Sequence, residues 1–161
     1  MGFHNKISSK IITPDKLSDY LDNWKKEHKK IVFTNGCFDI LHRGHVEYLA
    51  KAADLGDVLF VGLNTDTSVQ KIKGPTRPIQ DENSRATILA GLESVAAVAF
   101  FSEDTPYELI KKVQPDVLVK GADYKPSDIV GYDVVMAKGG SVETIQFVDG
   151  HSTTNIVNKL K

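Results

Sequence analysis

Two histidines three residues apart are the feature of this sequence whose types and spacing point most directly to chemistry. His42 and His45 follow an apolar run, residues 31–33, and a turn, and they open a helical pattern. Residues three apart on a helix lie on one face, and the free N–H groups of a helix N-terminus attract anions. Two imidazoles there can donate hydrogen bonds to phosphate oxygens, and Gly44 lets a ligand approach the backbone. The spacing therefore indicates a site for a phosphate chain at the end of a first strand.

Two other roles fit the same pair of histidines. A histidine at a helix start commonly caps the helix or lies on the surface, and a pair at this spacing can also ligate a metal. Zinc takes three or four protein ligands, and only Cys37 and Asp39 stand close enough in the sequence to add to the pair. Metal ligation is therefore the least supported role, whereas the residues alone leave capping and phosphate binding open.

The elements that must position these residues alternate along the chain. Thr13 and Pro14 have the types that begin a helix, and this helix is expected to end near Lys29. In the helix after the histidines we expect an inward face made of Val46, Leu49 and two alanines, Ala50 and Ala53. We predict strands at 31–34, 58–63, 95–101, 117–120 and 142–147, helices at 45–55, 81–91, 105–113, 131–138 and from 152 onward, and a loop with two prolines at 74–80.

Strands that alternate with helices predict an α/β fold. We expect a single doubly wound, Rossmann-like parallel sheet of about five strands, with helices on both faces. Ligands of such sheets bind beyond the carboxyl ends of the strands, where the strand order reverses. We divide the chain into an N-terminal helical extension, residues 1–30, packed on a domain of residues 31–161.

Composition excludes several classes of function. The chain has 161 residues, 41% of them hydrophobic, and a formal charge of −1, so it has no basic field for nucleic acid. No apolar run approaches the roughly 20 residues of a membrane span. One cysteine cannot form an internal disulfide, and the first ten residues lack the apolar core of a signal peptide. We expect a cytoplasmic protein whose partners are small molecules, with no nucleic acid and no membrane among them.

The segment 42–45 resembles the HxGH signature of the nucleotidyltransferase superfamily of cytidylyltransferases and adenylyltransferases. Further blocks at 61–66, 73–79, 118–124 and 149–156 resemble, within that superfamily, the heptose 1-phosphate adenylyltransferases of bacterial lipopolysaccharide-core synthesis. The resemblance runs from about Ile31 to Lys161. It implies a fold of the nucleotidyltransferase type and transfer of AMP from ATP to D-glycero-β-D-manno-heptose 1-phosphate, which gives ADP-heptose and pyrophosphate.

The resemblance also implies roles for individual residues. His42, His45 and Lys73 would be catalytic, because they would donate to the triphosphate and stabilise charge at its α-phosphate. The other implied nucleotide-binding residues are Asn35, Gly36, Cys37, Phe38, Asp39, Gly44, Lys71, Arg85, Ser152, Thr153 and Thr154. The implied sugar-phosphate-binding residues are Asn64, Asp66, Lys120 and Asp123.

Several of these residues have an ordinary structural alternative. Lys71 and Lys73 are expected in a loop after the second strand, where residues two apart in an extended segment point the same way. For Lys71, a plain surface position explains the residue equally well. Arg85 either contacts phosphate or lies exposed on its helix. Residues 152–154 suit a helix cap in either case, because capping hydroxyls and free N–H groups also build an anion site.

Asp39 and Cys37 stand in the turn before the histidines. For Asp39 we favour orienting the turn over meeting a ribose or a metal. Cys37 is interpreted as a small filler and not as a nucleophile, because the implied reaction has no covalent enzyme intermediate.

The implied reaction needs little from the protein beyond positioning and charge. A sugar phosphate is already ionised near neutral pH, since its second pKa is about 6, so no general base is required. A triphosphate substrate implies Mg²⁺, held mainly by phosphates and water. Chains of this family are often fused to a ribokinase-like kinase and commonly form dimers. The resemblance therefore implies that the kinase step comes from a separate protein or a separately expressed part, and a homodimer is compatible with the sequence.

Two rival functions remain open. One is a cytidylyltransferase acting on glycerol 3-phosphate or another polyol phosphate, and the other is a non-catalytic nucleotide-binding module on the same fold. Phe147 stands where glycerol-3-phosphate cytidylyltransferases have an arginine, which disfavours CTP. The intact histidine pair, Lys73 and the 152–154 block disfavour a non-catalytic module.

Overall fold

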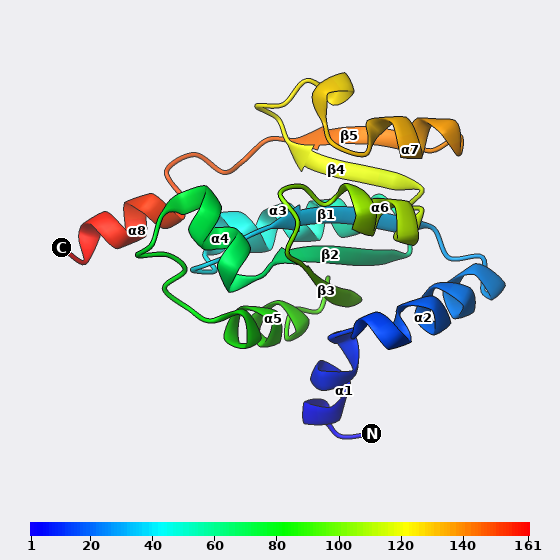
Figure 1. The fold of residues 1–161 in the computed structure, drawn as a ribbon, viewed down its shortest axis with the longest axis horizontal. Helices are drawn as coiled ribbons and strands as arrows, with labels where there is room; N and C mark the ends of the chain where they lie inside the picture. The colour runs from blue at the N-terminus through cyan, green and yellow to red at the C-terminus, as the bar shows by residue number, and fades with distance from the viewer.

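The computed structural model describes residues 1–161 and contains one five-stranded sheet (Figure 1). All strand pairs are parallel, and the order across the sheet is β3-β2-β1-β4-β5. The strand order therefore reverses between β1 and β4, which confirms the predicted doubly wound sheet. The strands are β1 (Ile31–Gly36), β2 (Val58–Asn64), β3 (Ala97–Phe101), β4 (Val117–Gly121) and β5 (Ser141–Ile145).

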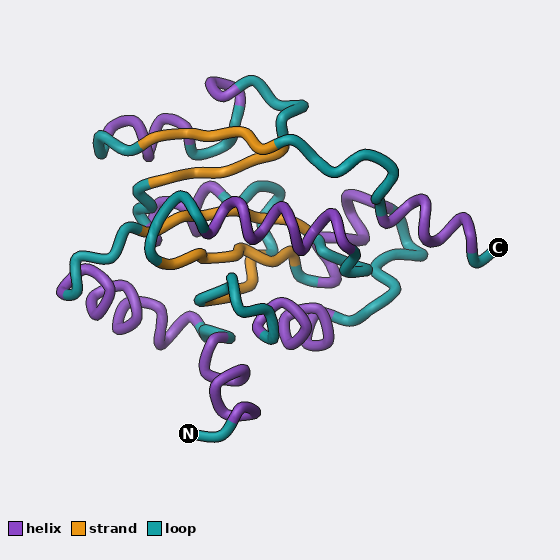
Figure 2. The backbone as a smooth tube through the Cα atoms, turned by 180° about the vertical axis from the view of Figure 1, so that it is seen from behind, coloured by secondary structure: helices purple, strands orange, loops and turns teal.

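Helices cover both faces of this sheet. The view from behind shows a long helix, α3, lying across the strands (Figure 2), while α6 crosses the opposite face in Figure 1. The helices are α1 (Phe3–Lys10), α2 (Pro14–Lys26), α3 (Arg43–Ala53), α4 (Asp66–Lys73), α5 (Glu82–Ala90), α6 (Tyr107–Val113), α7 (Tyr132–Ala137) and α8 (Thr153–Lys159), with a 3-10 turn η1 (Pro126–Asp128).

Alternate residues of each strand enter two separate apolar cores. Along β1, Val32 packs with α3 and α5, whereas Ile31 and Phe33 pack with α2, α6 and α7. In β4, Val117 and Val119 go to the first core and Leu118 to the second, and the other inner strands follow the same rule. This is the period of two that a strand imposes, and burial on both faces explains why the strands are continuously apolar in sequence.

The predicted strands and most predicted helices are confirmed to within a few residues at their ends, but two helices were missed. One is α1, which has no buried residue. The other is α4, which occupies the stretch expected to be a loop, so the placement of Lys71 and Lys73 in an extended segment is wrong. Thr65 caps α4 by accepting a hydrogen bond from the Ser68 N–H, and Asp66 stands in its first turn. Those cap residues were a readable signal for a helix.

The inward face predicted for the helix after the histidines is also partly wrong. The buried apolar side chains of α3 are Tyr48, Leu49 and Ala52, while Val46 and Ala50 are exposed. The helix begins at Arg43, two residues before the predicted start. The Tyr48 hydroxyl finds a buried partner 2.9 Å away, Thr34 Oγ1, which lets this polar aromatic residue enter the core in place of Val46.

The N-terminal residues pack against the sheet. Ile12 and Leu17 belong to the second core, and Ile11 forms a parallel bridge with Val98 of β3. Helix α1 also contacts α5. The division of the chain into residues 1–30 and 31–161 stays a prediction.

None of the helices is both long enough and apolar enough to cross a membrane.

Candidate active site

A cavity of about 290 Å³ lies where β1 and β4 end, at the point where the strand order reverses. Asn35 and Gly36, at the end of β1, form one side, and Lys120 and Gly121, at the end of β4, form another. This is the place at which doubly wound sheets bind their ligands. The remaining lining residues are Cys37, Phe38, Asp39, His45, Tyr48, Lys73, Asp123, Tyr124, Phe147 and Thr153.

The two histidines cap helix α3 reciprocally. His42 Nδ1 accepts a hydrogen bond from the Gly44 N–H at 3.0 Å, and His45 Nδ1 accepts one from the His42 N–H at 3.4 Å. The capping role that the sequence left open is therefore real. In a neutral imidazole whose Nδ1 accepts, Nε2 carries the proton. Capping thus fixes the tautomer, so each ring keeps an Nε2–H for a ligand.

The histidine rings stack on one another with centroids 3.8 Å apart and planes 25° apart. Burial, followed by the neighbouring His42 and Lys73, lowers the pKa of His45 to about 4, although a hydrogen bond to the Ile40 backbone opposes the shift. Burial and then His151 also lower the pKa of His42. Both rings are consequently neutral at neutral pH, so they can donate hydrogen bonds without adding charge.

Gly44 is buried between these rings and the C-terminal segment. A Cβ atom there would lie 2.8 Å from His42 Cε1 and 3.2 Å from His151 Cβ. A larger residue would push the capping ring away from the helix N-terminus, so the glycine of the motif is required by packing.

Two lysines from different elements face the cavity. Lys73 is the last residue of α4, and Lys120 lies near the end of β4. Desolvation lowers the pKa of Lys120, whereas Cys37 and Asp123 oppose that shift. The Lys120 Nζ also lies 5.6 Å from the centroid of the Tyr124 ring, a cation–π distance. Lys71 is exposed and does not line the cavity, since residues two apart on a helix point about 200° apart.

An aromatic wall, missed in the sequence, closes one side of the cavity. Phe147 stacks on Tyr48 with ring centroids 5.6 Å apart and planes 23° apart. A Cβ at Gly121 would come within 2.2 Å of the Phe147 ring, so the ring rests directly on the backbone at the end of β4. Phe147 nonetheless keeps 55% of its surface exposed. Burial raises the pKa of Tyr48 to about 12, which keeps its hydroxyl protonated.

Asp39 holds the neighbouring loop. Its carboxylate accepts hydrogen bonds from the Arg77 Nε at 2.6 Å and from the backbone N–H groups of Ile79 and Gln80. Burial alone would raise its pKa, but the Gln80 and Ile79 N–H groups and Arg77 outweigh burial and hold the pKa below its usual value. Both carboxylate oxygens are engaged, which gives Asp39 the orienting role that we favoured from the sequence.

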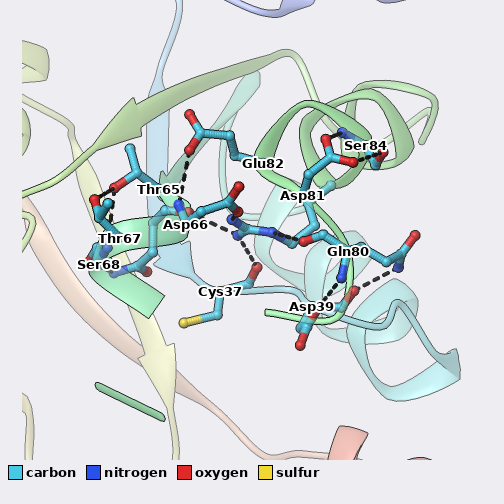
Figure 3. A network of polar contacts seen from close by, with 12 residues as sticks. Cys37, Asp39, Thr65, Asp66, Thr67, Ser68, Gln80, Asp81, Glu82 and Ser84 are labelled. Carbon is cyan, nitrogen blue, oxygen red and sulfur yellow. Dashed lines mark hydrogen bonds and ion pairs between the residues drawn. The ribbon is translucent and has the colours of Figure 1, made fainter. Parts of the chain in front are cut away.

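Arg85 lies in the centre of a polar network, and its partners Cys37, Asp66 and Gln80 are labelled in Figure 3. Only 1% of its surface is exposed, so its predicted alternative as a solvent-exposed helix residue is wrong. Its guanidinium donates to the carbonyl oxygens of Cys37, Asn64 and Gln80 and pairs with the carboxylate of Asp66. These acceptors belong to segments far apart in sequence. The sequence pattern of helix α5 alone therefore could not predict that Arg85 is buried.

The structure brings together only part of the predicted site. His42, Gly44, Ser152 and Thr154 border the cavity lining without belonging to it, and Lys71, Asn64, Asp66 and Arg85 lie outside it. Asn64 is buried and donates to Ser68, and Asp66 pairs with Arg85. The predicted residues that do line the cavity are Asn35, Gly36, Cys37, Phe38, Asp39, His45, Lys73, Lys120, Asp123 and Thr153.

The last helix reaches the cavity from the C-terminal segment. Ser152 caps α8 by accepting a hydrogen bond from the Asn155 N–H, as predicted. Thr153 donates to the Ile40 carbonyl at 3.4 Å and lines the cavity, so α8 begins beside the turn that precedes the histidines. Figure 1 shows α8 at the end of the molecule opposite α1 and α2.

No group of three or more His, Cys, Asp or Glu side chains is arranged to hold a metal ion.

A second hollow of about 970 Å³ lies at the opposite, amino-terminal edge of the sheet. This hollow contains none of the predicted site residues. Lysines there, such as Lys25 and Lys112, stand in the last turns of α2 and α6, where cations complement the helix dipole. The smaller cavity, which ten of the predicted residues line, is therefore the candidate active site.

A parallel doubly wound sheet, with paired histidines at the helix after β1 and lysines around a cavity at the reversal of strand order, defines the nucleotidyltransferase class of α/β proteins. The cytidylyltransferase-like family matches residues 33–159, and the chain belongs to that family.

Relatives and solved structures agree with this assignment. The chain is 54% identical over 161 residues to the bifunctional protein HldE of Geobacter metallireducens and 53% identical over 155 residues to that of Syntrophotalea carbinolica. These matches cover 99% and 96% of the chain, which spans about a third of each relative, 33% and 32% respectively.

Among solved structures, the lipopolysaccharide core biosynthesis protein from Thermoplasma volcanium is 29% identical, with a TM-score of 0.59 over 74% of this chain and 97% of that one. The pantoate-beta-alanine ligase from Francisella tularensis has the same TM-score of 0.59 at 17% identity, covering 93% of this chain and 77% of that one, and shares the fold alone.

Proposed function

We propose that the chain transfers AMP from ATP to D-glycero-β-D-manno-heptose 1-phosphate and releases pyrophosphate, with ADP-heptose as product. The observation that carries the proposal is the grouping of His45 and Lys73 at one cavity, with His42 stacked on His45, at the reversal of strand order. ATP and a sugar phosphate are small molecules of the cytoplasm, so we place the activity there.

The proposed reaction requires hydrogen-bond donors and positive charge around the phosphates, and the histidines and lysines at the cavity can supply both. An oxygen of the acceptor phosphate attacks the α-phosphorus of ATP, a new P–O bond forms, and the bond to the β-phosphate oxygen breaks. The Nε2–H groups of the two histidines would donate to the α-phosphate as its charge develops. Lys73 would neutralise charge on the leaving pyrophosphate. Preorganised donors of this kind are each worth roughly 10²–10³ in rate.

Magnesium would be held mainly by the substrate. Mg²⁺ in such sites takes one or two carboxylates at most, with water and phosphate oxygens completing its shell. The carboxylates around this cavity fit that pattern, because Asp39 already has both oxygens engaged and only Asp123 remains. When bound, the ion would neutralise the phosphates and favour the departure of pyrophosphate.

The acceptor would occupy the β4 side of the cavity. Lys120 offers a desolvated ammonium for the sugar phosphate, and Asp123 offers a carboxylate that accepts hydrogen bonds from sugar hydroxyls. The negative charge of Asp123 disfavours a triphosphate at that end. The name of the Thermoplasma volcanium structure, a lipopolysaccharide core biosynthesis protein, supports a sugar phosphate as acceptor.

The test is pyrophosphate release by the purified chain with Mg²⁺. ATP and CTP are compared as donors, and heptose 1-phosphate and glycerol 3-phosphate are compared as acceptors. We expect turnover with ATP and the heptose phosphate alone. Turnover with CTP and glycerol 3-phosphate would reassign the substrates, and ATP binding without turnover on any acceptor would favour a non-catalytic module.

A further inference from the structure

We infer that Arg85 is a positioning residue, which fixes the turn leading into the histidine pair against the helix that carries Lys73. The inference rests on the proposed function, because His45 and Lys73 are the groups proposed to act on the triphosphate. Arg85 itself does not line the cavity, and its side chain has no exposed surface. It therefore acts through the segments that it holds.

The guanidinium joins four segments at once. Its Nη1 donates to the Cys37 carbonyl at 2.8 Å, in the turn after β1, and to the Asn64 carbonyl at 2.9 Å, at the end of β2. Its Nη2 donates to Asp66 Oδ1 at 2.8 Å, in the first turn of α4. Its Nε donates to the Gln80 carbonyl at 3.0 Å.

Gln80 connects this network to Asp39. The Gln80 carbonyl accepts from Arg85, while its backbone N–H donates to Asp39 Oδ1 at 3.0 Å and its side-chain amide donates to the Asp39 carbonyl at 2.7 Å. The residues between Lys73 and α5 are thus tied to the turn before the histidines by two routes. One route runs through Asp39 and the other through Arg85.

Helix α5 also holds the start of α4 from its own first turn. Glu82 Oε1 accepts a hydrogen bond from the Asp66 N–H at 3.0 Å, next to the ion pair between Asp66 and Arg85. Both the backbone and the side chain of Asp66 are therefore fixed to α5. Because Lys73 ends the same eight-residue helix, the direction of α4 sets where its ammonium lies.

Only arginine can make this set of bonds. Its five N–H donors lie in one plane on three nitrogen atoms, whereas lysine has three donors on a single atom. Arg85→Lys keeps the buried charge but cannot reach acceptors on three sides. The variant should loosen the spacing between the turn and α4 without introducing an unpaired carboxylate.

Cys37 provides a readout that does not depend on activity. It is the one cysteine of the chain, its carbonyl is held by Arg85, and its half-buried thiol lines the cavity. The rate of alkylation by iodoacetamide therefore reports the geometry of the turn. In Arg85→Lys we expect alkylation several-fold faster than in the wild type, with the circular dichroism spectrum unchanged. Arg43→Lys, the same substitution at an exposed ion pair on α3, should react at the wild-type rate.

Kinetics supply the second readout. A misplacement of catalytic groups by about 1 Å can cost on the order of 10² in rate, so Arg85→Lys should lower kcat by about 10- to 100-fold while the KM for ATP stays within about twofold. A raised KM for ATP with an unchanged kcat would show that Arg85 binds nucleotide, and would overturn the inference. Wild-type alkylation in a folded Arg85→Lys would overturn it as well.

A second variant keeps the inference testable if Arg85→Lys does not fold. Asp66→Asn removes only the partly exposed end of the network and leaves the three carbonyl contacts in place. It should lower kcat and raise the Cys37 alkylation rate in the same directions but to a smaller extent. An effect confined to the KM for the sugar phosphate would instead make Asp66 an acceptor ligand. A wild type that binds ATP yet shows no turnover would count against the proposed function, whereas the alkylation result would still decide the role of Arg85.

Discussion

His42 and His45 form a stacked pair whose ring centroids lie 3.8 Å apart, and the Nδ1 atom of each ring accepts a hydrogen bond from a backbone N–H at the start of α3. The same atoms that cap the helix determine which nitrogen is protonated, so the structural and chemical roles are carried by different atoms of one ring. We therefore expect substitution of a histidine to lower the activity, and a fall in pH to lower the stability of the fold.

Replacing His45 by alanine should remove most of the activity and leave the fold. The loss of one preorganised donor predicts a fall in kcat of roughly 10²–10³, and the loss of its capping bond predicts about 1 kcal/mol of destabilisation. Pyrophosphate release and thermal unfolding measure the two effects. His4→Ala, at an exposed position of α1, is the matched control. Normal turnover of His45→Ala would refute the assigned role.

The stability of the protein should fall as the pH is lowered through the range in which unfolded histidine titrates. Because the pKa of His45 is about 4 in the folded protein and 6.5 in the reference state, the unfolded chain binds more protons between these values. Linkage then makes the free energy of unfolding larger at higher pH. Between pH 7 and 4.5 this one group predicts a loss of about 2 kcal/mol, and the lowered pKa of His42 acts in the same direction.

Urea unfolding at pH 7 and 4.5 tests this dependence. The matched comparison is His45→Asn, which has no titrating group at that position and should show a smaller loss of stability over the same range. Equal losses in the two proteins would mean that His45 is not the origin of the dependence. Carboxylates such as Asp39, whose pKa is lowered, contribute mainly below this window.

Two lysines on one helix should differ sharply in function. Lys73 lines the cavity, whereas Lys71 is exposed and points elsewhere on α4. We expect Lys73→Ala to lower kcat at least about tenfold, and Lys71→Ala to remain within about twofold of the wild type, as surface substitutions usually do. Steady-state rates of the two variants decide the matter, and similar losses in both would contradict the geometry described for α4.

Lys120 should affect the acceptor more than the nucleotide. If Lys120, a half-buried cation, pairs with the acceptor phosphate as proposed, its replacement by alanine should raise the KM for heptose 1-phosphate about tenfold or more, with a smaller change in the KM for ATP. Lys125→Ala, a nearby exposed lysine, is the control. Equal increases in both KM values would move Lys120 away from the sugar phosphate.

Most helices and strands were predictable because a local sequence pattern marks each of them without help from distant residues. Continuous apolar runs marked β1 and β2, and Thr13 with Pro14 marked the start of α2. Helix α4 escaped because its only buried residues are Ser68 and Val69, which leaves no apolar stripe to detect. Its cap at Thr65 was visible but stood next to residues expected to form a loop.

The cavity lining was predictable from the sequence where its residues stand in the turn and histidine motif or in one of the further blocks at 73–79, 118–124 and 149–156. His45 and Gly44 lie within four residues of one another, so their spacing carried the information. Arg85 and Phe147 depend on contacts with residues 48 and 26 positions away in sequence, at Cys37 and Gly121. No local pattern reports such contacts. The sequence left Arg85 between phosphate contact and an exposed position on its helix, and the exposed position is wrong.

The two apolar cores require the side chains of every strand to alternate between the two faces of the sheet. An insertion of one residue inside β1 or β4 would exchange the side chains that enter each core, because successive side chains point to opposite faces. An insertion in a loop beyond the strand ends, such as the segment 122–131, leaves the alternation of side chains in the strands unchanged. A change in the length of this segment, which contributes Asp123 and Tyr124 to the cavity, would therefore alter the lining and leave the scaffold beneath it unchanged.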